Sequence, residues 1–229
     1  MLMPIDGNYQ QAKRFDAQIA ASKPTHKRLW AEIVRSKLQQ QASALEAAGA
    51  PVAPLSALIN KVRSGDPDNL EAQGARRYWG LLFGEDFRRD QSGDGLNAML
   101  NYGYTVMRAA TARAVVGAGL HPTLGLFHSN EGNAMRLVDD LMEPFRPVID
   151  LRVWLLRRQN EVFITPETKR ALVRTLYDDM QTNSGATPVM VCMQRLATSL
   201  SQVYLGEREK LDLPLPSLPL GLAASLVDE

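Results

Sequence analysis

Hydrophobic positions along this chain recur at the three-to-four-residue spacing of amphipathic helices. In the stretch 128–147 the spacing is kept by Ala134, Leu137, Val138, Leu141 and Met142. We expect a helix here with one face toward a core. A proline at position 144 would close it, and a serine or asparagine at 129 or 130 would cap its start.

A second stretch, about residues 92–117, is rich in Ala, Met, Leu and Val on most faces, as expected for a helix at the centre of a bundle. No segment shows the alternation of a strand. The sequence therefore predicts an all-α fold, a multi-helix bundle around this central apolar helix, with no sheet. Further helices are expected over 9–49 with a break near 22–24, and over 55–63, 66–83, 148–158, 165–180 and 188–205.

Composition narrows the class of protein only a little. The 229 residues carry a net charge of +1, so nucleic-acid binding would need local basic patches. The single cysteine excludes a disulfide framework within one chain and fits a cytoplasmic setting. No apolar run approaches the roughly 18 residues of a membrane helix, so no membrane partner is expected.

Candidate chemistry lies on the polar face of the first predicted helix. Asp139, Asp140 and Glu143 project from that face, and His128 stands just outside its first turn. Carboxylates and an imidazole together can bind a hard divalent cation. The same pattern is also typical of a solvated surface with a few ion pairs, and periodicity alone leaves both interpretations open.

Two other segments also allow both a surface interpretation and a functional one. Glu71, in the predicted helix 66–83, is either a surface glutamate near a helix start or a ligand. Small residues at 72, 74 and 75 would let another element pack closely against it. The segment that follows position 144 is rich in arginine, including Arg146, Arg157 and Arg158, and is either an ordinary surface helix or a path for a DNA backbone.

Three separated segments resemble one known family. They are similar to sequence motifs of the CRISPR adaptation integrases, and most of all to those of the type II branch. The segments are EAQGARRYW at 71–79, LNYGY at 100–104, and the stretch from HSN at 128–130 to EPFRP at 143–147. The likeness runs from about Tyr9 to Leu205. It implies that Glu71, His128 and Glu143 bind Mg²⁺ or Mn²⁺ and form the catalytic site, with Asp140 in or beside that site.

The resemblance also implies a reaction and its partners. Members of this family are endonucleases and integrases that join the 3′-hydroxyl ends of prespacer DNA to repeat phosphates by transesterification. Expected partners are double-stranded or branched DNA, a second adaptation protein that forms a small ferredoxin-like dimer, and another copy of the full-length chain. DNA phosphates would be contacted by Arg76, Arg146, Arg157 and Arg158.

The domain organisation is expected to differ from the family's usual one. The family begins with a β-rich domain, and here IDGNYQQAKR, at 5–14, resembles the junction after it. We therefore expect a linker remnant at 1–7, a helical catalytic domain at 8–206 and a proline-rich tail at 207–229 that is extended across a surface or mobile. The alternative function is a catalytically inactive, truncated helical module that only binds DNA or a partner protein.

Overall fold

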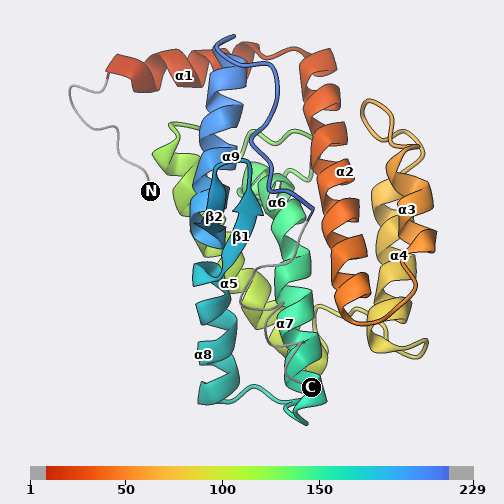
Figure 1. Cartoon of the computed structure of the whole chain (residues 1–229). Helices are drawn as coiled ribbons and strands as arrows, with labels where there is room; N and C mark the ends of the chain where they lie inside the picture. Colours follow the sequence, from red (N-terminus) through yellow and green to blue (C-terminus); the bar gives the residue numbers. More distant parts are fainter. Residues whose placement is uncertain (1–8, 217–229) are drawn as a thin grey trace.

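The computed structural model describes residues 9–216, and within that range the chain is a helical bundle with one small hairpin (Figure 1). Its α-helices are α1 (Tyr9–Ala20), α2 (Lys23–Ala47), α3 (Ala53–Ile59), α4 (Leu70–Phe83), α5 (Leu96–Gly117), α6 (Arg136–Met142), α7 (Arg146–Arg158), α8 (Pro166–Arg174) and α9 (Val189–Tyr204). Two 3₁₀ turns, η1 (Glu143–Phe145) and η2 (Thr175–Tyr177), join helices to their successors. The predicted all-α class is confirmed.

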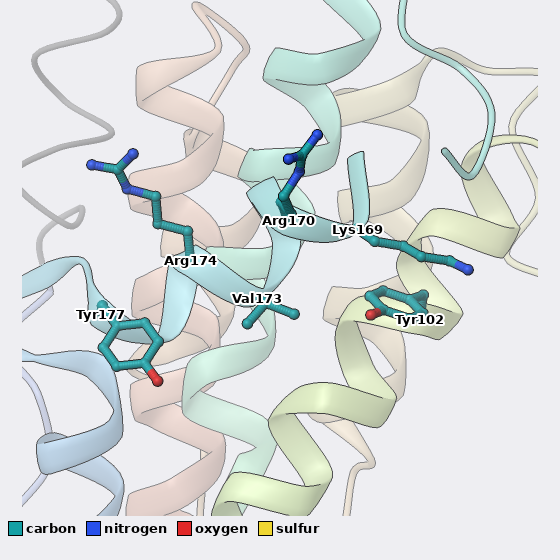
Figure 2. Close-up of a pocket in the computed structure, with 6 residues that line it drawn as sticks. All are labelled: Tyr102, Lys169, Arg170, Val173, Arg174 and Tyr177. Atoms are coloured by element: carbon teal, nitrogen blue, oxygen red, sulfur yellow. The ribbon is translucent and has the colours of Figure 1, made fainter. Parts of the chain in front are cut away.

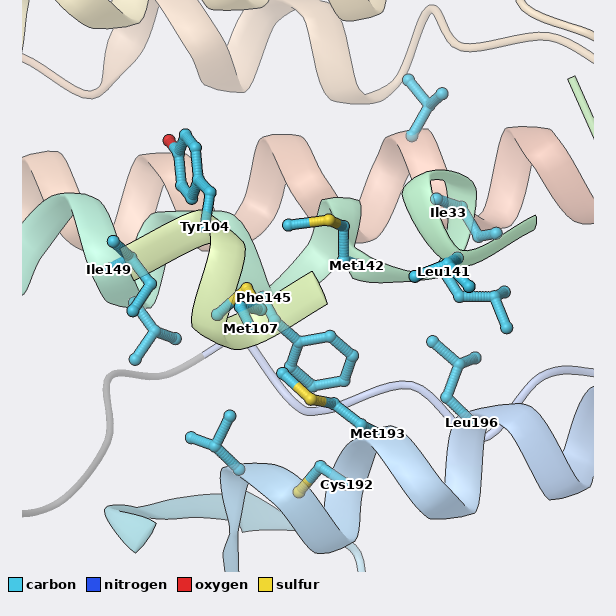
Figure 3. Close-up of a cluster of buried hydrophobic side chains, with 14 of the residues drawn as sticks. Ile33, Tyr104, Met107, Leu141, Met142, Phe145, Ile149, Cys192, Met193 and Leu196 are labelled. Atoms are coloured by element: carbon cyan, nitrogen blue, oxygen red, sulfur yellow. The ribbon is translucent and has the colours of Figure 1, made fainter. Parts of the chain in front are cut away.

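Helix α5 lies at the centre of the bundle, as predicted. It packs against α6, α7, α8 and α9, and its residues Met99, Leu100 and Met107 are fully buried. Figure 3 shows Met107 of this helix among apolar side chains of the surrounding helices, including Phe145 and Met193. The helix begins at Leu96 rather than near 92, because Gly95 adopts a positive φ that ends the preceding loop.

The expected sheetless fold is wrong at one place. Strands β1 (Asp179–Thr182) and β2 (Gly185–Pro188) form an antiparallel hairpin, with Asp179 opposite Pro188 and Thr182 opposite Gly185. The helix expected over 165–180 ends at Arg174. The turn closes because Gly185 adopts a φ of 97° and its carbonyl accepts a hydrogen bond from the Thr182 hydroxyl at 2.8 Å.

The helix expected within 128–147 also differs. Neither Ser129 nor Asn130 caps it; α6 starts only at Arg136, after a turn-rich segment. The acidic face does not simply lie in solvent, because Asp140 is fully buried and Glu143 is 5 % exposed. Position 144 ends α6 as expected, but the chain continues at once through η1 into α7.

The close helix packing that was predicted at the small residues of α4 is confirmed at Gly74, and a second close contact occurs at Gly103. A Cβ on Gly74 would lie 2.3 Å from the Leu38 side chain, so only glycine lets α4 approach α2 so closely. A Cβ on Gly103 would lie 2.5 Å from Ile149, which is the equivalent contact between α5 and α7. Helix α2 packs against both α4 and α7, and lies between them in the view of Figure 1.

The described part of the predicted tail, up to residue 216, lies across the bundle. The Leu215 amide donates to the Gln181 carbonyl at 3.2 Å, and the Gln40 side chain donates to the Leu215 carbonyl at 2.7 Å. Leu211 is buried. The rest of the tail and the predicted linker at 1–7 fall outside the described residues. Among the described helices, none is long and apolar enough to cross a membrane.

Candidate metal and DNA site

Two carboxylates from distant parts of the sequence meet at one buried lysine. Lys37 of α2 forms a short ion pair with Glu71 of α4, and its Nζ lies 2.5 Å from Oε2 of Glu143 in η1. Lys37 and Glu143 are 6 % and 5 % exposed, whereas Glu71 is partly exposed. Burial by itself would lower the pKa of Lys37, but the charges of Glu143 and Glu71 outweigh it and raise that pKa.

The position of Glu71 follows from the way α4 begins. Asp66 is buried with a φ of 48°, and its carboxylate accepts hydrogen bonds from the amides of Leu70 and Glu71 at 2.9 and 3.0 Å. Asn69 caps the same turn through the Ala72 amide at 3.4 Å. The helix start is therefore held by side chains, and Glu71 sits in its first turn facing α2.

Glu143 has a second cationic neighbour, Arg146. The Arg146 Nε lies 2.9 Å from Oε1 of Glu143, and its guanidinium carbon lies 4.9 Å from the centre of the Tyr104 ring. Burial would raise the pKa of Glu143, but Arg146 and Lys37 lower it overall. Glu143 is thus held ionised inside the protein by two cations.

His128 is oriented by Asp140 rather than by solvent. Its Nδ1 lies 2.6 Å from Oδ1 of Asp140, and the other carboxylate oxygen accepts from the amides of Leu126 and Phe127 at 2.7 and 3.2 Å. The hydrogen bond to Asp140 raises the pKa of His128. The Asp140 carboxylate accepts a hydrogen bond from Nδ1–H of His128. In the neutral ring, Nε2 therefore carries the lone pair that is free to bind a metal ion.

Aromatic packing holds the loop that carries His128. Phe127 stacks on the buried Trp30 of α2 with ring centres 4.5 Å apart, and the His128 ring meets Trp30 edge-on at 5.9 Å. Phe127 is nevertheless 49 % exposed. This loop is therefore anchored to α2, the helix that also carries Lys37.

Another buried carboxylate belongs to Asp150 of α7. It accepts a short hydrogen bond from the Tyr104 hydroxyl, and burial raises its pKa to about 7. The charges of Arg146 and Lys37 act in the opposite direction. Arg146 and Asp150 are one helical turn apart, so α7 presents a cation and an acid to the same interior space.

The donor set fits a divalent cation, although no metal site is preformed. In residues 9–216, no three His, Cys, Asp or Glu side chains form a cluster that could hold a metal ion unaided. Glu71 and Glu143 do converge on a single positive charge, that of Lys37. Oxygen and imidazole ligands of this kind suit Mn²⁺ and Mg²⁺.

The four arginines expected to contact DNA lie in different environments. Arg76 on α4 and Arg157 and Arg158 at the end of α7 are exposed. Arg157 donates to the Phe83 carbonyl at 2.7 Å, and Arg158 lies over the Trp154 ring at 5.1 Å. Arg146 is only partly exposed, and it pairs with Glu143.

A separate pocket of about 350 Å³ lies along α8. Figure 2 shows its lining of two aromatic rings, three cationic side chains and a valine: Tyr102, Lys169, Arg170, Val173, Arg174 and Tyr177. It shares no residue with the carboxylate cluster. Cationic groups beside aromatic rings suit an anionic or aromatic ligand rather than a metal ion.

Sequence reasoning gave no role in the site to Lys37, Tyr104 or Asp150. For Lys37 a signal existed, because it follows Leu29 and Ile33 at four-residue steps and so lies on the buried face of α2. A lysine in such a stripe needs a buried counter-charge. Asp150 likewise lies among the apolar residues of α7.

This geometry defines a class of protein: a helical domain in which two acids converge on buried cations and a third acid orients a histidine. The chain also matches, over residues 2–173, the family model described as CRISPR associated protein Cas1. It is 37 % identical over 223 residues to the CRISPR-associated endonuclease Cas1 of Neisseria meningitidis serogroup C (strain 8013), covering 95 % of this chain and 73 % of the relative. The chain belongs to the Cas1 family.

Other similarities agree with that membership. A Cas1 endonuclease of Pyrobaculum aerophilum is 27 % identical over 65 % of this chain, and the chain spans 52 % of that relative. A casposase bound to integration product superposes with a TM-score of 0.77 at 22 % identity, covering 93 % of this chain and 69 % of the other. A CAS1 protein from Thermotoga maritima gives 0.68 at 15 % identity, with 86 % and 70 % covered. At these identities the two structures show a shared fold.

Proposed function

We propose that this chain is the catalytic part of a divalent-metal-dependent DNA endonuclease and integrase of CRISPR spacer acquisition. The observation that supports it most is the convergence of Glu71 and Glu143 on one buried cation, together with a histidine whose orientation is set by Asp140. Family membership supports the same reaction, the joining of DNA 3′-hydroxyl ends to phosphates.

In this proposal the metal ligands are Glu71, Glu143 and Nε2 of His128. Mg²⁺ or Mn²⁺, when bound, supplies positive charge to the phosphate and orients the attacking oxygen. Asp140 does not act as a ligand. It fixes the ring of His128 and, through the amides of Leu126 and Phe127, the loop around it.

DNA would be held mainly through its phosphates. Arg76, Arg157 and Arg158 are exposed and can make such contacts without reading sequence. Arg146 can contribute only while it also pairs with Glu143, so its loss should affect the site as well as DNA binding. Placement in the type II branch is part of this proposal.

Partner proteins are proposed from similar solved structures and from the family resemblance. Two similar solved structures are a Cas6-RT-Cas1–Cas2 complex and a partial form of it, with TM-scores of 0.74 and 0.75 at 17 % and 16 % identity. They support assembly of this chain with a second adaptation protein that forms a small ferredoxin-like dimer. Pairing of two copies of the full-length protein is proposed from the family resemblance.

The test compares wild type with Glu71→Gln, His128→Ala and Glu143→Gln. Mn²⁺ binding is measured by calorimetry, and cleavage and joining of labelled branched DNA are measured on the same samples. Each variant should lose at least about a hundredfold in metal-dependent turnover, while Glu85→Gln, an exposed control, should keep it. Full activity in all three site variants would refute the proposal, whereas salt-sensitive DNA binding without turnover in wild type would support the inactive-module alternative.

A further inference from the structure

Lys37 is placed by the fold where a divalent cation would be expected. Its side chain enters the interior from the apolar face of α2 and is 6 % exposed. Its ammonium contacts carboxylate oxygens of both Glu71 and Glu143. These are the two acids proposed as metal ligands, so the inference below rests on that proposed function.

Charge balance explains why a cation is needed there. Two carboxylates brought together away from water repel each other and lose hydration, and an uncompensated pair would neutralise or move apart. Lys37 and Arg146 supply two positive charges to the two acids. Without metal, the cluster of these four side chains is therefore electrically neutral.

We propose that Lys37 is an internal counter-ion that holds Glu71 and Glu143 together in the metal-free protein and is exchanged for the metal when the metal binds. Lys37 is therefore a positioning residue, and it competes with metal for the same oxygens.

A role for Lys37 in contacting the DNA phosphate predicts a different effect of its removal on metal affinity. If its ammonium stayed beside the metal and contacted the DNA phosphate, removing it would reduce turnover but would not change metal affinity through competition. Metal affinity in the absence of DNA separates the two roles, because no phosphate is present.

The experiment measures Mn²⁺ binding by calorimetry and urea unfolding, with and without Mn²⁺, on the full chain. It compares wild type, Lys37→Met, Lys37→Gln and the exposed control Lys23→Met. Both Lys37 variants should be less stable without metal, because two buried acids lose a partner. They should bind Mn²⁺ about tenfold or more tightly than wild type and gain more stability from it. Lys23→Met should match wild type throughout.

Equal or weaker Mn²⁺ binding by a folded Lys37 variant would overturn the inference. If neither variant folds without metal, a structure of wild type with Mn²⁺ decides: the Lys37 ammonium should have left both carboxylates, and a retained bridge would refute exchange. Wild type that binds no Mn²⁺ would refute the proposed metal site and this inference together. Binding that is lost in Glu143→Gln but not tightened in the Lys37 variants would refute the inference alone.

Discussion

Asp140 and Glu143 lie one helical turn apart, and both are buried, yet the fold satisfies them in opposite ways. Asp140 is held by backbone amides of the 126–128 loop and by His128. Glu143 is held by the charged side chains of Lys37 and Arg146. An acid held by fixed backbone dipoles has a structural role, whereas an acid held by side-chain cations can exchange one of them for another cation. The region around Asp140 therefore orients the site, whereas the region around Glu143 can exchange a side-chain cation for a metal ion.

The largest expected effect concerns the backbone-held acid. Asp140→Ala removes the acceptor of three amides and of the His128 ring, and leaves the buried Leu126 amide and three partly buried donors without this partner. We expect a loss of about 3–5 kcal/mol in the free energy of unfolding, measured in urea without metal. A loss below about 1 kcal/mol would mean that the loop is not held by this carboxylate.

The cation-held region should instead respond to pH through Asp150. The pKa of this acid is raised from 3.8 to about 7, so between these values the folded protein keeps a proton that the unfolded chain has lost. The protonated Asp150 therefore contributes to the free energy of unfolding in full below about pH 4, and this contribution is lost progressively as pH rises from about 4 to about 7. Asp150→Asn stays neutral, so its stability relative to wild type should rise by about 2–4 kcal/mol from pH 4 to pH 8. A difference that does not vary with pH would contradict the raised pKa.

Mn²⁺ affinity should also respond differently to substitutions of Asp140 and of Glu143. Asp140→Asn keeps a side-chain oxygen of the same size but weakens the hold on the His128 ring, so Mn²⁺ affinity should fall about tenfold to a hundredfold. Glu143→Gln removes a proposed ligand and should abolish binding. Calorimetry on both variants checks this, and equal losses would remove the distinction between an orienting acid and a ligand.

The smallest effect is expected at the aromatic contact beside His128. Phe127→Ala removes the ring stacked on Trp30, but about half of Phe127 is already exposed. We expect a loss of about 0.5–1.5 kcal/mol in urea unfolding, with Mn²⁺ affinity within a factor of about three of wild type. A large loss of metal affinity would mean that the ring stack, rather than Asp140, orients the histidine.

Much of the fold could be predicted because helices are local. The apolar spacing identified the central helix α5. The helix expected from 165 onward does start there, with Thr165 as its cap, and small residues in α4 mark its close approach to α2. The hairpin at 179–188 was missed because two four-residue strands carry too little alternation to be distinguished from the end of a helix. The predicted caps of α6 failed because turns intervene before the helix starts, and the Asn130 side chain accepts from the Gly132 amide instead.

The sequence by itself determined the helical class, the family and a short set of candidate acids, because helical periodicity and motif wording are properties of neighbouring residues. Only the tertiary structure decided what each acid faces. Lys37 precedes Glu71 by 34 residues and Glu143 by far more, and no spacing rule joins them. Burial and electrostatic pairing depend on where helices cross in space, so the counter-ion of the site emerged only when α2, α4 and η1 were brought together.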